Sequence, residues 1–144
     1  MKSQKIVFSL AAIDTVQFAT LGNVPNTTDN LEETIALSFK ILEASHIIDC
    51  IFGYTLFNSK TPFLTIQATC SFKINKKDFE KLLNSSTFKI PVSFAQHITM
   101  LTVGTTRGIL HSKTENTPFN AFPISLIDLD SIINEDILIN ISIE

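Results

Sequence analysis

The residues from His46 to Ile74 read HIIDCIFGYTLFNSKTPFLTIQATCSFKI, and the rest of the chain can be interpreted around them. Two apolar runs flank four turn-forming residues between Asn58 and Thr61, which is typical of a β-hairpin. From Leu64 onward apolar and polar side chains alternate, which predicts an antiparallel strand with one buried and one solvated face. The first run also carries apolar side chains on its second face, and these need cover from elsewhere: Ile47, Ile51 and Phe57.

Length and composition fit one domain covering residues 1–144. A chain of this length buries roughly two thirds of its surface on folding. The net charge is −3 and the eleven basic residues are dispersed along the chain, which argues against nucleic acid as a partner. No apolar run approaches the ~20 residues of a membrane span, so we expect a cytoplasmic protein without membrane insertion. With only 17% charged residues, the chain has either a large core or apolar surface for a partner.

Two further strands are predicted before the hairpin. The first covers Ile6 to Ala19 and places most apolar side chains on one face, with Asp14 near a rim or bulge. The alternative for this N-terminal stretch is a short signal peptide, but its period of two favours a strand. The polar stretch from Thr20 to Asn30 is a loop of crossing length, and Leu31 to Leu42 forms the next strand.

Helical patterns follow the hairpin. Asn75 can cap a short helix, and Pro91 can begin a longer one. Apolar spacing predicts that the longer helix buries one stripe, made of Phe94, Ile98, Leu101 and Thr105. Its β-branched threonines leave a strand over residues 98–106 as the alternative. A proline-marked irregular segment, a brief helix over residues 124–134 and a final alternating strand or tail, ILINISIE, complete the chain.

Chemically reactive constellations are absent from the sequence. It has no glycine-rich phosphate loop, no Gly-x-Ser-x-Gly elbow and no His-Glu-x-x-His pair. The histidines are expected at a strand start, in a helix and in a loop, with ordinary surface or capping roles: His46, His97 and His111. The acidic residues Asp128, Asp130, Glu135 and Asp136 lack the spacing of a calcium loop. We therefore expect no enzyme, no metal and no nucleotide cofactor.

The two cysteines, Cys50 and Cys70, fall almost opposite each other when the hairpin is paired about its turn. We expect two reduced thiols on the buried face, with a cross-strand disulfide as the alternative.

The order of elements and several residues resemble the SecB family of export chaperones, over about Phe8 to Ile133. The family's Glu-x-Gln-x-x-Gly-x-Phe-x-Ile strand motif is matched by Gln67, Phe72 and Ile74, while Thr65 and Cys70 replace Glu and Gly. The Pro-Tyr-Ala-Arg-Glu and Arg-Gly motifs of its long helix are echoed at Pro91, Phe94, Ala95, Arg107 and Gly108. Its later Pro-x-Asn-Phe-x-x-Leu is echoed at Pro123, Ser125, Leu126 and Leu129.

This resemblance implies an α+β fold with a four-stranded antiparallel sheet, a crossover loop after the first strand and helices on one face. It also implies a holdase that binds unfolded or nascent polypeptide in apolar grooves, either for export through the SecA motor or for a toxin–antitoxin pair. Family members end in an acidic or mobile tail suited to SecA, whereas this chain ends in ILINISIE. The groove walls implied for this chain are Phe18, Leu21, Val24, Phe119, Phe122, Ile124 and Leu126.

A homo-oligomer is expected, as a dimer of dimers in the manner of the family. The first strand is the natural element to pair between subunits, because edge strands are seldom left unpaired. The long helix over residues 92–109 would pack the dimers together, so the interface residues would be Phe8, Leu10, Phe94, Ile98 and Leu101. The alternatives to a chaperone are a dimerising adaptor or structural protein and a binder of small apolar ligands.

Overall fold

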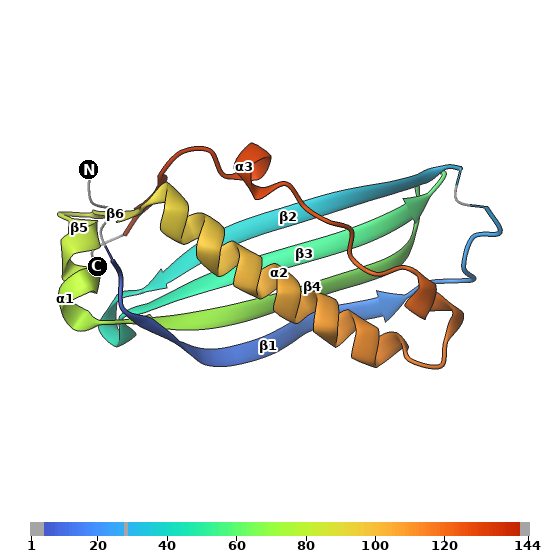
Figure 1. Ribbon diagram of the computed structural model, residues 1–144, viewed down its shortest axis with the longest axis horizontal. Coiled ribbons are helices and arrows are strands. Elements are labelled where there is room, and N and C mark those ends of the chain that lie inside the picture. Colours follow the sequence, from blue (N-terminus) through green and yellow to red (C-terminus); the bar gives the residue numbers. More distant parts are fainter. Residues whose placement is uncertain (1–4, 28, 142–144) are drawn as a thin grey trace.

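A four-stranded antiparallel sheet forms the body of the protein in this computed structural model, which describes residues 5–27 and 29–141 (Figure 1). Its strand order is β1-β4-β3-β2, where the strands are β1 (Phe8–Thr20), β2 (Leu31–Leu42), β3 (Ile47–Asn58) and β4 (Thr61–Ile74). Because β1 and β2 lie at opposite edges, the connection between them crosses from one edge to the other. The predicted α+β class and crossover loop are confirmed.

The central hairpin of β3 and β4 forms as predicted. Its turn places Ser59 and Lys60 at φ 50° and 70°, the left-handed conformation that a two-residue hairpin turn requires. Cys50 lies directly opposite Cys70, and both thiols are buried and free. The apolar side chains of the predicted dry face are all buried: Ile48, Cys50, Phe52, Tyr54, Leu56, Leu64, Ile66, Ala68, Cys70, Phe72 and Ile74.

The edge strand β1 contains two bulges, at Ala11 and at Val16. Each extra residue reverses the direction of the side chains that follow it. Ile13 therefore lies opposite Cys70 on the helix-covered face, and Asp14 faces the open side of the sheet. The predicted apolar face is therefore wrong at Ala12 and Val16 and confirmed at Phe8, Leu10 and Phe18, which lie opposite buried residues of β4.

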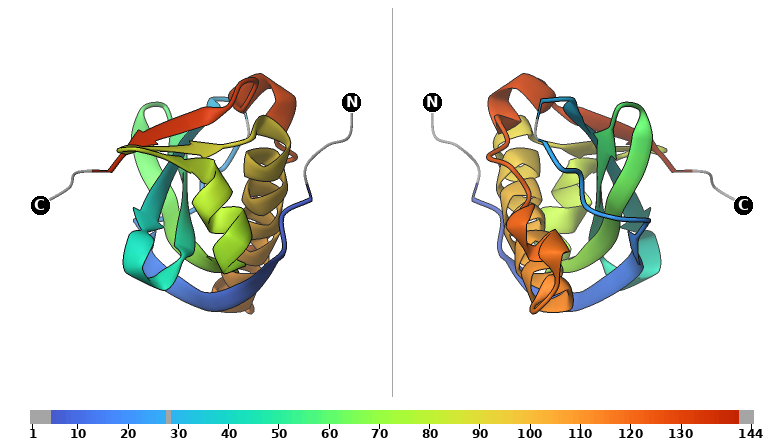
Figure 2. Two further views of the ribbon diagram at one scale, coloured as in Figure 1. Left: turned by 90° about the vertical axis from the view of Figure 1, so that its left-hand side faces the viewer. Right: turned by 90° about the vertical axis from the view of Figure 1, so that its right-hand side faces the viewer.

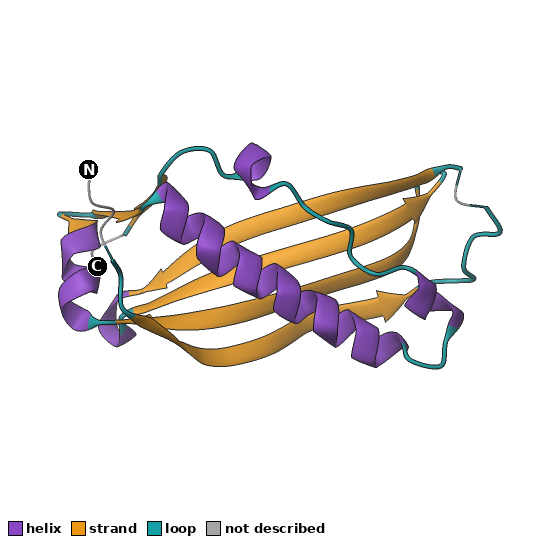
Figure 3. Cartoon of the chain, viewed as in Figure 1, coloured by secondary structure: helices purple, strands orange, loops and turns teal. Residues whose placement is uncertain are grey.

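The long helix α2 (Val92–Thr114) begins directly after Pro91 and crosses one face of the sheet diagonally (Figures 1 and 3). The helix prevails over the strand alternative although its buried side is rich in threonine. The hydroxyl of Thr102 donates to the carbonyl of Ile98, and that of Thr106 donates to Thr102, each at 2.7 Å. These bonds within the helix satisfy the buried hydroxyl groups, so threonine can serve as a core residue.

The predicted buried stripe of α2 is only partly right. Phe94 and Ile98 are buried, but Leu101 is exposed and Thr105 is half-exposed. Threonines and small apolar residues take their place against the sheet, because the crossing angle turns a different side of the helix inward: Ala95, Thr99, Thr102, Val103, Thr106, Leu110 and Thr114.

A small second sheet closes one end of the molecule and was not predicted. It consists of β5 (Leu83–Asn84), β6 (Thr87–Ile90) and β7 (Ile137–Asn140), in that order. The short helix α1 (Lys76–Leu82) precedes it and is capped as expected, because the amide of Lys77 donates to the Asn75 side chain at 3.0 Å. The final alternating segment thus forms a strand paired with β6, while Ile143 lies outside the described residues.

The segment after α2 runs back over the same face of the sheet. It begins with the 3₁₀ turn η2 (Pro118–Ala121) and reaches a single helical turn, α3 (Leu129–Ile132). The predicted helix over residues 124–134 is therefore wrong for most of its length. The turn between β2 and β3 is a second 3₁₀ turn, η1 (Glu43–Ser45).

The molecule thus has two layers, with the sheet on one side and α2 with the returning segment on the other (Figure 2). Among the described residues, no helix covers the far face of the sheet (Figure 2). On this face β4 presents mainly threonine, serine and glutamine, and Thr65 bonds Thr55 of β3 at 2.8 Å. Ile47, Ile51 and Phe57 lie on this face and are half-buried by their neighbours. Less of their apolar surface is therefore left for a partner to cover than the sequence indicated.

Candidate functional site

Three apolar cavities adjoin residues 120–129 of the returning segment. The first, here called the helix cavity, has a volume of about 430 Å³ and lies between α2 and η2, lined by Gly104, Arg107, Gly108, Leu110, His111, Thr114, Asn120, Phe122 and Pro123. The flank cavity, of about 190 Å³, continues along α2 and is lined by Met100, Val103, Arg107, Leu126, Ile127 and Leu129. The strand cavity, of about 320 Å³, lies on the β2 side and is lined by Leu31, Glu32, Glu33, Tyr54, Leu56, Ala121, Phe122, Pro123 and Ser125.

The segment from Phe122 to Leu126 forms the wall between these cavities. Two sets of hydrogen bonds, here called clamps, hold this wall in place. From α2, Arg107 donates through Nε to the carbonyl of Ile124 at 3.0 Å and through Nη2 to that of Ser125 at 2.9 Å. From the sheet, Glu33 accepts a hydrogen bond from the Ser125 hydroxyl, with oxygen distances of 2.7 and 2.9 Å. Burial and the hydrogen bond to Glu33 raise the pKa of Tyr54 to about 12, so this phenol remains a neutral donor beside the carboxylate. The wall is therefore fixed from both sides.

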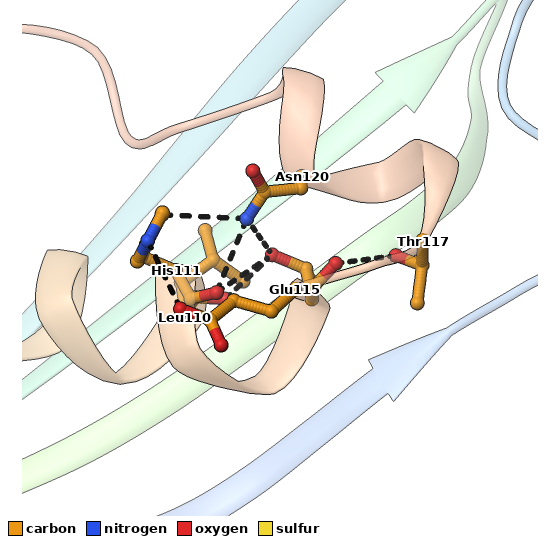
Figure 4. A network of polar contacts seen from close by, with 6 residues as sticks. Leu110, His111, Glu115, Thr117 and Asn120 are labelled. Carbon is orange, nitrogen blue, oxygen red and sulfur yellow. Dashed lines mark hydrogen bonds and ion pairs between the residues drawn. The ribbon is translucent and has the colours of Figure 1, made fainter.

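A polar network fixes the turn that leads into this wall (Figure 4). The amide nitrogen of Asn120 donates to the His111 carbonyl at 3.1 Å and to the Thr114 hydroxyl at 3.0 Å, and it lies 3.3 Å from His111 Nδ1. His111 Nε2 lies 3.4 Å from a carboxylate oxygen of Glu115. The hydroxyl of Thr117 closes the turn on the Thr114 carbonyl at 2.7 Å. His111 lies within α2, not in a loop as the sequence indicated.

The seven predicted groove residues fall into three groups. Phe18, Phe119 and Phe122 pack at the margin of one buried cluster, and the ring of Phe122 meets that of Phe63 edge to face at 5.2 Å. Ile124 is a buried member of that cluster, whereas Leu126 is 95% exposed at the mouth of the flank cavity. Leu21 is exposed and Val24 half-exposed on the crossover loop, and neither lines any of the three cavities. The two predicted walls therefore share a cluster but not a single pocket.

No protein family's sequence profile matches the chain, and no curated protein matches it either. Its fold, however, is similar to that of a SecB-like chaperone from Mycobacterium tuberculosis, solved in complex with a ChAD peptide from the HigA1 antitoxin. The TM-score is 0.51 and the sequence identity 11%, over 83% of this chain and 86% of that one. The chain has a SecB-like fold.

The predicted interface residues occupy different layers of this SecB-like fold. Phe94 and Ile98 are buried in the core beneath α2, so they cannot form a contact between folded subunits, and their assignment to the interface is wrong. Phe8 is half-buried, with its ring 5.0 Å from that of Phe94. Leu10 on β1 and Leu101 on α2 remain exposed.

Among residues 5–27 and 29–141, no three His, Cys, Asp or Glu side chains gather to hold a metal ion. No described helix is long and apolar enough to cross a membrane. Sequence reasoning noted Arg107 only as part of a motif and missed the roles of Glu33, Tyr54 and Asn120, because isolated polar residues carry no periodic signal.

We expect the buried thiol of Cys50 to make stability fall at alkaline pH. Burial raises the pKa of this thiol from 9.0 to about 11 in the folded protein. Between these values the unfolded chain loses the proton and the folded chain keeps it, so stability present below pH 9 is lost as pH rises toward 11. From pH 8 to 10.5 the free energy of unfolding should drop by about 2 kcal/mol through this group.

The measurement is urea unfolding at both pH values, in the presence of reductant, with Cys50→Ala as the comparison. The alanine variant loses some stability at every pH because it leaves a small cavity, but its alkaline loss should be smaller by the stated amount. An identical pH dependence in both proteins would contradict the prediction.

Proposed function

We propose that the protein is a chaperone of the holdase type, which binds unfolded or nascent polypeptide and performs no chemistry. The observation that carries the proposal is the arrangement of three open apolar cavities around one rigidly clamped wall, from Phe122 to Leu126. Extended peptide places side chains alternately on two sides, and cavities on both sides of a wall suit that geometry. Aromatic walls present large apolar area at low rotamer cost and need no matched hydrogen bonds.

Two further points support the proposal. Leu126 leaves nearly its whole side chain in water beside a cavity, which is unfavourable unless a partner covers it. The similar SecB-like chaperone was solved with an antitoxin peptide, which makes peptide the first ligand class to examine in this chain. Its clients would be unfolded polypeptide in general export, with the SecA motor as receiver, or the antitoxin of a toxin–antitoxin pair. We place it in the cytoplasm, as a dimer of dimers without cofactor.

The test is suppression of aggregation by a variant that removes exposed apolar surface and leaves the core intact. Leu126→Ser combined with Leu21→Ser should fold with unchanged melting temperature, because both leucines already contact water. Its capacity to keep an unfolded model protein soluble should fall several-fold, because each large side chain that a client covers contributes about 1.5 to 3 kcal/mol.

The matched control is Leu138→Ser on β7, which removes a leucine of similar exposure far from the cavities. Undiminished suppression by the double variant, or equal loss in the control, would rule out the assigned surface. Complete lack of suppression by the unaltered protein would rule out the holdase function itself.

A dimerising adaptor is the second candidate, and one observation favours it. Leu10 and Ile13 on β1 and Leu101 on α2 expose apolar surface and line none of the three cavities. Aggregation assays separate the two candidates, because an adaptor gives oligomers without suppression.

A further inference from the structure

Arg107 stands between the helix cavity and the flank cavity and lines both. It is the one permanently charged side chain among the residues that line these two cavities. Much of the remaining lining is apolar, including Leu110, Phe122 and Val103. A ligand that occupies both cavities at once must therefore place a group compatible with this positive charge between its apolar groups.

The hydrogen bonds of Arg107 leave its charge unmatched. Two of the five guanidinium N–H groups are used, and both bond neutral backbone carbonyls, at Ile124 and Ser125. Within the described part of the chain, no carboxylate forms an ion pair with it. The carboxylate of Glu33 accepts its hydrogen bond from Ser125, on the sheet side of the wall. The guanidinium is thus held in a fixed position, half-withdrawn from water, with donors still free.

The part of α2 next to Arg107 carries two glycines, which present no side chains to the helix cavity. Gly104 and Gly108 line the helix cavity, and a Cβ atom added at either position would meet open space. Side chains are therefore missing from the part of α2 that a ligand backbone would approach. The apolar walls formed by Leu110, Phe122 and Pro123 complete a cavity large enough for an aromatic or branched side chain.

We infer that Arg107 is a recognition residue for a carboxylate that lies next to a large apolar side chain in a bound extended peptide. The apolar side chain would occupy the helix cavity, a second one the flank cavity, and the carboxylate would meet the free guanidinium donors between them. Arginine and carboxylate form short, charge-assisted and often bidentate hydrogen bonds, which supports this pairing. The carboxylate is either an internal aspartate or glutamate side chain or the C-terminus of the peptide. The inference rests on the proposed peptide-binding function and gives it a sequence preference.

The experiment measures fluorescence-detected binding of matched synthetic peptides to the full-length protein. One pair is acetylated and amidated and carries a central aspartate or asparagine between phenylalanine and leucine. The other pair ends in phenylalanine as a free acid or as an amide. The acidic member of at least one pair should bind roughly ten- to a hundredfold more tightly, since hydrogen bonds to charged groups contribute that much. The pair that shows the difference identifies the source of the carboxylate.

Three variants locate the effect. Arg107→Gln should reduce the acid-to-neutral affinity ratio to about one, and Arg107→Lys should retain part of it, with circular dichroism and melting confirming that each folds. Gly104→Leu adds a good helix former at a position with free space, so it should fold stably and weaken binding of every peptide by filling the helix cavity. Lys40→Gln is the matched control, because it removes a positive charge from an exposed position on β2 outside the three cavities, and it should preserve the ratio.

Several results would overturn the inference. Equal binding of acidic and neutral peptides by the unaltered protein would remove the carboxylate site and leave apolar peptide binding intact. An unchanged ratio in Arg107→Gln, or unchanged binding by Gly104→Leu, would place recognition elsewhere. A change of oligomeric state in Arg107→Gln would assign the guanidinium to a subunit contact. No binding of any peptide would remove the proposed function together with this site.

Discussion

Replacing Phe72 with alanine is expected to lower the free energy of unfolding by about 3 to 5 kcal/mol, a large fraction of the total stability of a small domain. Phe72 lies on β4 opposite Ile48, is fully buried beneath α2 and meets the ring of Phe8 at 5.9 Å. Its neighbours come from two strands, so they cannot collapse into the vacated space without moving the sheet. Urea unfolding followed by circular dichroism measures the loss.

Phe57→Ala on β3 is the matched control. Phe57 is a phenylalanine of the same hairpin, but it lies on the open face and is only half-buried. Its removal leaves a solvent-filled dent in place of a cavity and should cost about 1 kcal/mol. Similar losses in the two variants would mean that the helix-covered face is not the principal core.

The hairpin was predictable because its pattern is strong and local. Turn residues at 58–61 and the alternation from Leu64 to Ile74 predict the turn and its two strands, whereas the one-residue shift of register next to the turn, where Leu56 pairs with Leu64, was not predicted. The start of α2 at Pro91 and the cap at Asn75 were predictable for the same reason, since each depends on adjacent residues.

Errors arose where distant contacts decide the outcome. The bulges of β1 depend on its pairing with β4, and no local signal marks Ala11 or Val16. The buried side of α2 depends on its crossing angle, and threonines there satisfy their hydroxyls within the helix, so a count of apolar residues points to the wrong stripe. The small sheet needs β7, which lies almost fifty residues after β6 in the sequence.

At the candidate site too, features that depend on neighbouring residues were predictable, and features that depend on distant contacts were not. The aromatic residues near Phe122 were predictable as a group from their composition and from the SecB resemblance. The clamp that makes them a rigid wall joins Glu33 on β2 to Ser125 across 92 positions of sequence, and a pattern within one segment cannot reveal it. Leu126 lines the flank cavity, and its near-complete exposure follows from the extended course of residues 124–128, where a helix was expected.

The free edge of β1 should determine the oligomeric state. Changing both Leu10 and Ile13 to lysine is expected to convert a dimeric or tetrameric protein into a 16.0 kDa monomer. The two side chains are 51% and 50% exposed on the helix-covered side of the strand, and the outer edge of β1 pairs with no described strand. A second copy would cover both the apolar side chains and the unpaired backbone groups.

Symmetry enlarges this effect, because each substitution occurs twice in a two-fold interface. Loss of even one large apolar contact in each subunit weakens association by roughly a hundredfold. Sedimentation velocity at micromolar concentration measures the change. Leu138→Lys is the control, since Leu138 is 67% exposed on β7 at the other sheet and should leave assembly unaltered. A monomeric unaltered protein would refute the oligomer, whereas an unaltered assembly in the double variant would move its interface away from β1, toward the exposed side of α2 around Leu101.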